Sequence, residues 1–328
     1  MNLSRRCFVK LAAAAVPFAS GVGGCRTLEP TWEPGGIPLG VQTYSFRDML
    51  STPGDMVDKM IAAMRELGVT ECEVFEPTLQ PPSLSADAPW RMVAGKPTEA
   101  SLLGRPPVGA PTSAQRATQE GMRKWRLGEG LDQVKTAGDK FRRAGIRVRA
   151  FNYLLKDWCT DDEVEVGLKM TRALGADIMT ASTTLSMAKR CVPLVKKHEV
   201  FLAMHGHSNL SDPNQFATPD SFAQALAMSR YYRVNLDVGH FFASGFDPVG
   251  YISANHRWIT NLHIKDRKRN DGPNMPFGRG DTPIAAIMQL LKEQAWAIPS
   301  HIEYEYAGKG SSTWEVGQCL AYVKSVLV

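Results

Sequence analysis

Short hydrophobic runs alternate with longer amphipathic stretches from residue 37 to the C-terminus. Short apolar runs bounded by turn-forming residues are typical of buried strands, whereas apolar residues that recur every three to four positions are typical of helices packed on a core. This pattern predicts eight strands, over residues 39–44, 71–75, 147–152, 177–181, 200–205, 234–237, 259–263 and 300–303.

Most of these strands are separated by stretches that predict helices. Several of the stretches begin with Asp, Ser or Thr or carry a proline in the first turn, as helix starts do. The predicted helices cover residues 53–67, 114–126, 129–143, 161–174, 186–197, 219–228, 248–255, 283–293 and 313–326. Eight βα units in about 290 residues fit an α/β fold of the (β/α)8 TIM-barrel type. The alternative, a doubly wound open sheet, usually has a glycine-rich turn after its first strand, and residues 43–49 contain no glycine.

One connection, between the second and third strands, is much longer than the others. It begins with an insertion at residues 77–113, which is rich in proline and has little periodicity. Loops of this length are usually functional or disordered. In a barrel the insertion would emerge at the carboxyl ends of the strands, so we expect a lid or wall over the active site. A surface insertion is the alternative.

The N-terminus has the features of a targeting segment. Arg5 and Arg6 precede an apolar stretch at residues 11–19, far shorter than the roughly 20 residues that span a bilayer. Residues 1–25 resemble a twin-arginine signal peptide, which implies export to the periplasm by the twin-arginine translocase. Residues 22–25 resemble a loose lipoprotein box, with Cys25 as the site of a lipid anchor, and plain cleavage is the alternative. Residues 26–36 predict a linker and residues 37–328 the barrel.

Composition narrows the class of protein. The chain is 44% hydrophobic and 22% charged, as in a soluble globular protein, which excludes collagen-like and polytopic membrane proteins. The net charge is only +5, so we expect no nucleic-acid partner. The six cysteines are scattered without C-x-x-C spacing, which favours buried thiols over disulfides. The sequence is compatible with either a monomer or a homo-oligomer.

Ionisable residues recur where the predicted strands end. Because these ends converge at one mouth of a TIM barrel, residues far apart in sequence form one cluster there. The residues concerned are Glu73, His205 with His207, Asp237 with His240, His263, and Glu303.

Four of these residues, from four successive strands, predict a metal site. The carboxylates of Asp237 and Glu303 suit Mn²⁺ or Mg²⁺, and the imidazoles of His205 and His263 also admit Co²⁺ or Zn²⁺. Such a set leaves coordination positions for substrate hydroxyls. His207 and His240 are weaker candidates, for contact with the metal or the substrate or for orienting a ligand.

At this point the chain resembles the sugar phosphate isomerase/epimerase superfamily, the xylose isomerase-like TIM barrels. The motifs are GVQTYSFRD at 40–48, ECEVFEP at 71–77, LDVGH at 236–240, HIKDR at 263–267 and IEYEY at 302–306. The resemblance implies one divalent ion, with Mn²⁺ the first choice, held by the four residues above. It also implies that Glu73, His240 and Arg267 contact the substrate. Further candidate substrate contacts are His207, Tyr44 and Asn152.

His205 departs from the pattern of the ketose epimerases, which have a glutamate that acts as an acid/base group there. Glu303 then remains as a catalytic proton acceptor, with His207, His240, Lys265 or Glu73 as its partner. The expected reaction is proton abstraction next to a carbonyl on a sugar. It would serve isomerisation, epimerisation, or elimination or hydration of a 3-keto-glycoside. Export argues against a phosphorylated substrate.

Two alternatives to such an enzyme remain. A non-catalytic carbohydrate-binding barrel would bind sugars without turnover. An apurinic-site endonuclease of the same superfamily needs histidines at the second and third strand ends, where this chain has Glu73 and Asn152.

Overall fold

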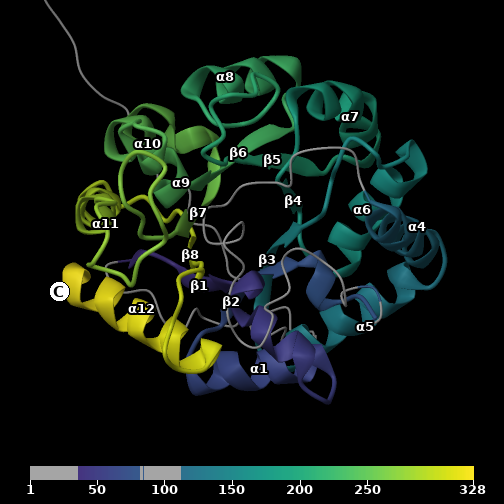
Figure 1. Cartoon of the computed structure of the whole chain (residues 1–328), viewed down its shortest axis with the longest axis horizontal. Helices are drawn as coiled ribbons and strands as arrows, with labels where there is room; N and C mark the ends of the chain where they lie inside the picture. The colour runs from purple at the N-terminus through teal and green to yellow at the C-terminus, as the bar shows by residue number, and fades with distance from the viewer. Residues whose placement is uncertain (1–35, 82–83, 85–111) are drawn as a thin grey trace, which may run out of the picture.

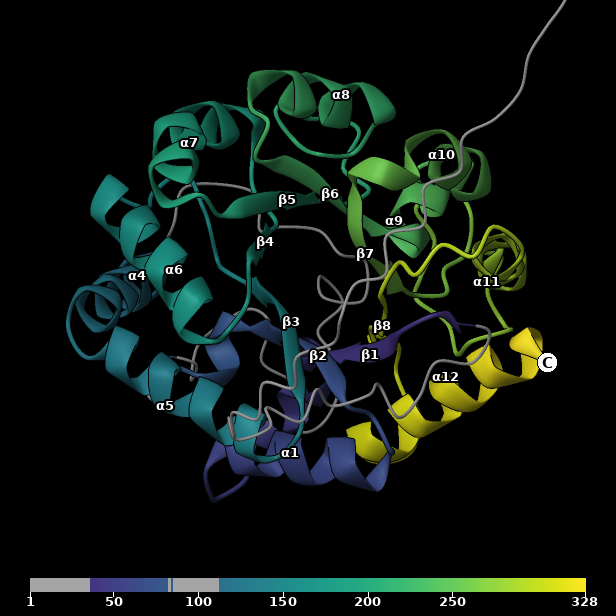
Figure 2. The ribbon, with the colours of Figure 1, turned by 180° about the vertical axis from the view of Figure 1, so that it is seen from behind.

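The computed structural model describes residues 36–81, 84 and 112–328. These residues form a closed barrel of eight parallel strands, which Figures 1 and 2 show from opposite sides. The strands are β1 (Leu39–Gln42), β2 (Glu71–Phe75), β3 (Arg147–Asn152), β4 (Ile178–Ala181), β5 (Phe201–His205), β6 (Tyr232–Asp237), β7 (Ile259–Ile264) and β8 (Ser300–Ile302). The predicted TIM barrel is confirmed, and closure of the sheet excludes the doubly wound alternative.

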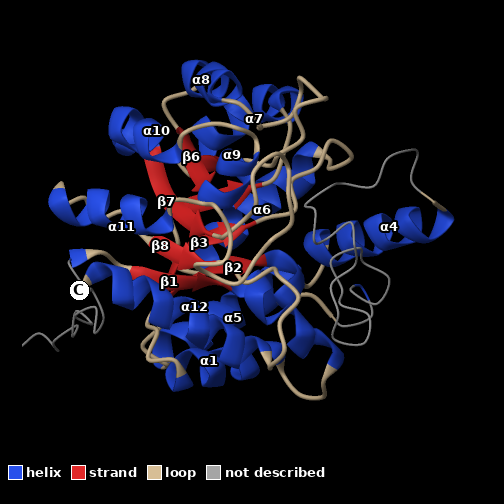
Figure 3. Cartoon of the chain, turned by 60° about the vertical axis from the view of Figure 1, so that its left-hand side comes forward, coloured by secondary structure: helices blue, strands red, loops and turns tan. Residues whose placement is uncertain are grey.

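Helices surround the barrel, with the strands at the centre (Figures 1 and 3). They are α1 (Met56–Glu66), α4 (Ser113–Leu127), α5 (Gly130–Arg143), α6 (Asp161–Ala173), α7 (Leu185–His198), α8 (Pro219–Met228), α9 (Val238–Ala243), α10 (Pro248–Asn255), α11 (Ile284–Glu293) and α12 (Ser312–Leu327). Short 3-10 helices are η2 (Thr43–Ser51), η3 (Glu76–Thr78) and η4 (His256–Trp258). Local sequence explains several starts: Thr160 and Thr218 form capping boxes at the starts of α6 and α8.

Two elements differ from the predicted pattern, both where a strand enters the mouth of the barrel. Strand β1 ends at Gln42, because the Gln42 side chain accepts a hydrogen bond from the backbone N–H of Tyr44 and starts η2. Tyr44 therefore lies outside the strand. The short helix α9 follows β6 directly and starts where Asp237 accepts a hydrogen bond from the backbone N–H of His240 at 2.7 Å. Its residues are all buried, so they show no amphipathic pattern that would predict a helix.

Arg126, a buried residue on α4, connects this helix to the barrel and to α6 through ion pairs. Both nitrogens Nε and Nη2 of Arg126 donate to the Glu76 carboxylate at 2.7 Å, and Nη1 donates to Glu163 on α6 at 3.1 Å. Bidentate pairs of this kind fix geometry as well as contribute energy. Residues 85–111, most of the predicted lid, lie outside the described residues, as do the predicted signal peptide and most of the linker.

The main apolar core lies between the strands and the helices, and a smaller apolar cluster lies at the carboxyl ends of β1–β3. The smaller cluster contains Tyr44, Phe75, Met122 and Leu154, so its residues come from three strand ends and from α4. The cysteines of the described residues are buried and unpaired, as predicted. No helix among the described residues is long and apolar enough to cross a membrane.

Candidate metal centre

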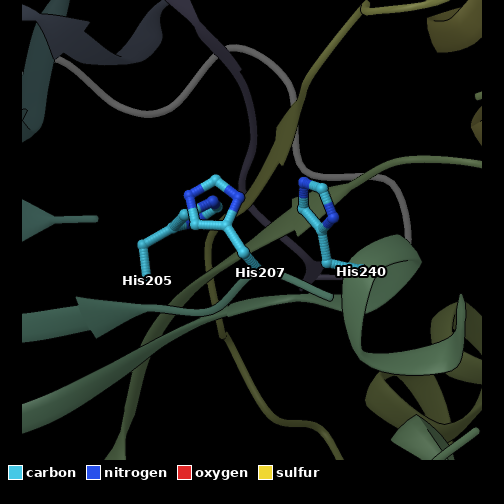
Figure 4. A group of neighbouring side chains, drawn as sticks. All are labelled: His205, His207 and His240. Atoms are coloured by element: carbon cyan, nitrogen blue, oxygen red, sulfur yellow. The ribbon is translucent and has the colours of Figure 1, made fainter. Parts of the chain in front are cut away.

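The four predicted ligands meet at the carboxyl ends of β5–β8. One donor atom from each of His205, Asp237, His263 and Glu303 lies within 4.8 Å of all the others, and each of these residues is buried. Barrel geometry explains the meeting, because the strand ends converge and side chains that alternate inward share one layer. A second group, His205, His207 and His240, satisfies the same distance limit (Figure 4).

Directly below this cluster, the carboxylate of Glu73 forms the centre of a polar layer inside the barrel. Oε1 accepts hydrogen bonds from Gln42, Asn152 and Thr180, and Oε2 accepts from Asn235 and Asn261. His263 Nε2 is 2.8 Å and His301 Nδ1 is 3.4 Å from Oε2. Glu73 is fully buried, so the donors around it replace the water that its charge would otherwise need.

This layer orients the two histidines of the cluster. His263 donates its Nε2 proton to Glu73, which turns Nδ1 towards Glu303 Oε2 at 3.0 Å. His205 Nδ1 lies 2.8 Å from Asn235 Oδ1, and an amide oxygen can only accept, so Nε2 of His205 keeps a free lone pair. A metal-binding histidine typically has its second nitrogen held in this way.

The charges of the cluster are strongly coupled. Burial alone would lower the pKa of His263, but Glu73 and Glu303 outweigh it and raise this pKa to about 10. Burial would raise the pKa of Glu303, yet Lys265 and His263 hold it well below its usual range. When no metal ion is bound, His263 is therefore protonated, and binding of an ion would release that proton.

Lys265 provides the positive charge that faces the carboxylates. Its Nζ lies 3.1 Å from Asp237 Oδ2, 3.0 Å from Glu303 Oε2 and 2.7 Å from Glu305 Oε2. Burial would lower the pKa of Lys265, but the three carboxylates raise it well above its usual value. The ammonium group therefore stays charged and is a poor proton acceptor.

Arg267 uses all its donors within the protein. Its five N–H groups meet Gly272 O twice, Ser208 Oγ, Asp271 Oδ1 and His240 Nδ1. The contact with His240 Nδ1 is 2.6 Å, and because a guanidinium can only donate, Nδ1 accepts and the ring proton lies on Nε2. That nitrogen is 3.3 Å from Lys265 Nζ, whose three N–H groups are matched by the carboxylates of Asp237, Glu303 and Glu305, so none is left for Nε2. Neither ring nitrogen of His240 then offers a lone pair to a metal, which favours the four-residue group over the three-histidine group.

His207 differs from its neighbours because it is partly exposed. Its Nε2 lies 2.9 Å from Ser182 Oγ, and its Nδ1 is buried and has no hydrogen-bond partner among the described residues. Burial, followed by the neighbouring His205 ring and the Lys156 ammonium, holds the pKa of His207 well below its usual value. His207 is therefore neutral, and its ring centre is 4.9 Å from that of His205 and 4.8 Å from that of His240.

Four residues that we expected to contact the substrate are paired or packed within the protein instead. Glu73 and Asn152 hydrogen bond to each other inside the barrel. Arg267 has no donor left for a substrate. Tyr44 is 8% exposed, with its ring against Phe75 and the Arg47 guanidinium 4.5 Å from the ring centre.

Residues around the cluster that sequence reasoning missed are Asn235, Asn261, His301 and Glu305. A signal for them exists, because each lies two positions from a predicted site residue. Asn235 and Asn261 lie on β6 and β7 with Asp237 and His263, whereas His301 on β8 and Glu305 just after it flank Glu303. Residues two apart on a strand point to the same side, so the period of two could have located them.

Residues 132–318 match the family described as xylose isomerase-like TIM barrel, so the chain belongs to this family. Its similarity to curated relatives is modest: L-ribulose-5-phosphate 3-epimerase UlaE of Salmonella heidelberg is 22% identical over 215 residues, 62% of this chain and 68% of that protein.

Solved structures show the same fold. The probable 3-DHS dehydratase AsbF of Bacillus anthracis has a TM-score of 0.58 at 12% identity, over 87% of this chain and 98% of that one. A crystal structure of IOLI protein with a bound zinc atom has a TM-score of 0.57 at 13% identity, over 89% and 98%. At these identities the likeness concerns the fold alone.

Proposed function

We propose that this protein is a divalent-metal-dependent enzyme that abstracts a proton next to a carbonyl on a non-phosphorylated sugar or keto-sugar. The observation that carries the proposal is the meeting of two carboxylates and two imidazoles, from four strands, within 4.8 Å. Isomerisation, epimerisation and the elimination or hydration of a 3-keto-glycoside all begin with such a proton transfer.

The residues present fit a metal ion. Asp237 Oδ1 is used by the cap of α9, whereas Oδ2 is buried without an aligned hydrogen bond and faces the cluster. The free lone pair of His205 Nε2 and the Glu303 carboxylate complete a mixed oxygen and nitrogen donor set with His263 Nδ1, which suits Mn²⁺ and admits Mg²⁺, Co²⁺ or Zn²⁺. A divalent ion bound there supplies Lewis-acid polarisation of a substrate oxygen.

Proton transfer falls to Glu303 and His207. Of the four partners considered for Glu303, Glu73 is enclosed by donors and Lys265 is held as an ammonium ion by three carboxylates. His240 is fixed by Arg267 with its proton on Nε2, so it serves as a hydrogen-bond donor. His207 is neutral like His240, but it is partly exposed and its Nδ1 has no hydrogen-bond partner within the described part of the chain.

The relatives support this chemistry in outline. UlaE is an epimerase and AsbF a probable dehydratase, and both reaction types fit proton removal beside a carbonyl. The zinc atom in IOLI protein supports a divalent ion. The resemblance of residues 1–25 to a twin-arginine signal peptide supports a periplasmic site of action and argues against a phosphorylated substrate, and Cys25 would give a lipid anchor.

The test is hydrogen exchange. Metal-loaded protein is incubated in D₂O with free sugars and 3-keto-glycosides, and NMR follows deuterium incorporation or elimination. We expect a substrate whose exchange stops after chelation and returns when Mn²⁺ is restored. Tight sugar binding with no exchange on any compound would instead support the non-catalytic carbohydrate-binding barrel.

A further inference from the structure

The polar residues next to the proposed metal centre are of two kinds: some are buried and paired within the protein, and others are partly exposed. Lys265, Arg267 and Glu305 are each less than a tenth exposed and are paired within the protein. His207, Ser182 and Lys156 are partly exposed. They lie on the loops that follow β5, β4 and β3, so a substrate at the centre meets this row of residues.

Hydrogen bonds hold the row together. Lys156 Nζ donates to the backbone oxygen of Ser182 at 2.7 Å, and Ser182 Oγ lies 2.9 Å from His207 Nε2. Ser182 therefore links the ammonium group to the proposed base. An ammonium group has three N–H donors, and within the described part of the chain only one of those of Lys156 is engaged.

Among the described residues, Lys156 forms no ion pair, unlike the other cations next to His207 and the four predicted ligands. Lys265 faces three carboxylates, Arg267 faces Asp271, and His263 faces Glu303. No carboxylate among the described residues forms an ion pair with Lys156, and its neighbour Asp157 accepts instead from Thr184 Oγ1 at 2.5 Å. A partly buried ammonium that forms no ion pair is unfavourable. Burial lowers the pKa of Lys156 and outweighs the charge of nearby Asp157, which raises it.

We propose that Lys156 binds a carboxylate group of the substrate on the β3–β5 side of the metal centre. The inference rests on the proposed function, because it needs a sugar at that centre. It specifies the substrate class as an acidic sugar or keto-sugar. The anion would supply the missing negative charge and accept the two unused N–H groups.

The test compares three ligands that differ at one end: D-gluconate, neutral D-glucitol and D-glucitol 6-phosphate. Calorimetry measures their binding to Mn²⁺-loaded protein. We expect gluconate to bind about tenfold or more tightly than glucitol, as a charge-assisted hydrogen bond implies. Preference for the phosphate ester over gluconate would overturn the carboxylate assignment and would contradict the non-phosphorylated substrate of the proposed function.

The variants Lys156→Met and Lys156→Arg decide whether Lys156 causes the preference. We expect Lys156→Met to lose it while glucitol affinity stays unchanged, and Lys156→Arg to keep most of it. Lys169→Met, the same change at an exposed position of α6, is the matched control. Thermal unfolding checks that each variant is folded.

The outcomes separate the two claims. A preference for anions that survives in Lys156→Met, or binding of glucitol as tight as that of both anions, overturns the role of Lys156 and leaves the proposed function in place. If no ligand binds and no deuterium is exchanged, the proposed function fails and this inference fails with it.

Discussion

Glu73 Oε2 lies 2.8 Å from His263 Nε2, on the side of the imidazole ring opposite Glu303. The carboxylate therefore fixes which nitrogen of His263 faces the cluster. Its own position is fixed in turn by donors from β1, β3, β4, β6 and β7. A charged group at the centre of the barrel thus couples the fold to the proposed metal site.

Glu73→Gln should weaken metal binding. The neutral amide holds His263 less firmly and lowers its basicity, and loss of such a supporting group typically costs about 10- to 100-fold in affinity. Calorimetric titration with Mn²⁺ measures the effect. Glu71→Gln, the same change in the same strand, is the control for loss of stability alone. Equal affinities of Glu73→Gln and wild type would remove Glu73 from the metal site.

Arg267→Met should leave metal occupancy intact but reduce turnover. The substitution removes the donor that holds His240 Nδ1 at 2.6 Å, so the ring can take either tautomer. Nitrogen-correlated NMR should show one tautomer of His240 in the wild type and a mixture in the variant. A single unchanged tautomer in Arg267→Met would show that Arg267 does not fix the ring.

Glu303→Gln should retain the fold and lose turnover. The amide keeps the shape of the side chain but cannot accept the substrate proton, and general-base catalysis contributes typically about 10²- to 10⁴-fold. Deuterium exchange on the substrate gives the rate, and metal analysis of the same sample separates loss of the base from loss of the ion. Glu293→Gln, at an exposed position of α11, is the matched control. Full activity of Glu303→Gln would reject its role.

The strand order and the meeting of the four predicted ligands could be predicted, because both depend on local pattern and on topology. Apolar runs identify the strands, and the convergence of strand ends in a barrel brings His205 and Asp237 together. The roles of Glu73 and Arg267 were not predictable in this way. Each role depends on hydrogen-bond partners from several elements. The local sequence does not indicate whether partners far along the chain will use all the hydrogen-bonding groups of a side chain. Tyr44 lies outside the predicted strand because of a side-chain contact as well: the Gln42 side chain accepts a hydrogen bond from the backbone N–H of Tyr44 and ends the strand.

Acid should destabilise the protein partly through Glu71, at the start of β2. Burial would raise the pKa of Glu71, but His301 and Arg149 outweigh it and lower this pKa to about 2. A lowered carboxyl pKa stabilises the fold above about pH 4.5, its unfolded value, and the contribution disappears as pH falls towards 2.

Glu71→Gln tests this relation. At pH 7 the variant should be less stable by up to about 3 kcal/mol, the upper bound set by the pKa shift. Denaturant unfolding between pH 7 and pH 3 should show the difference from wild type shrinking below about pH 4.5. A difference that stays constant with pH would contradict the assigned ion pairs.

The most direct test of the metal centre is the metal content after equilibrium dialysis against Mn²⁺, measured by elemental analysis. Wild-type protein should retain one ion per chain, as should His256→Ala, which changes a histidine that stacks on Trp296 away from the cluster. His205→Ala should retain far less than one. No ion in the wild type, or full occupancy in His205→Ala, would contradict the account.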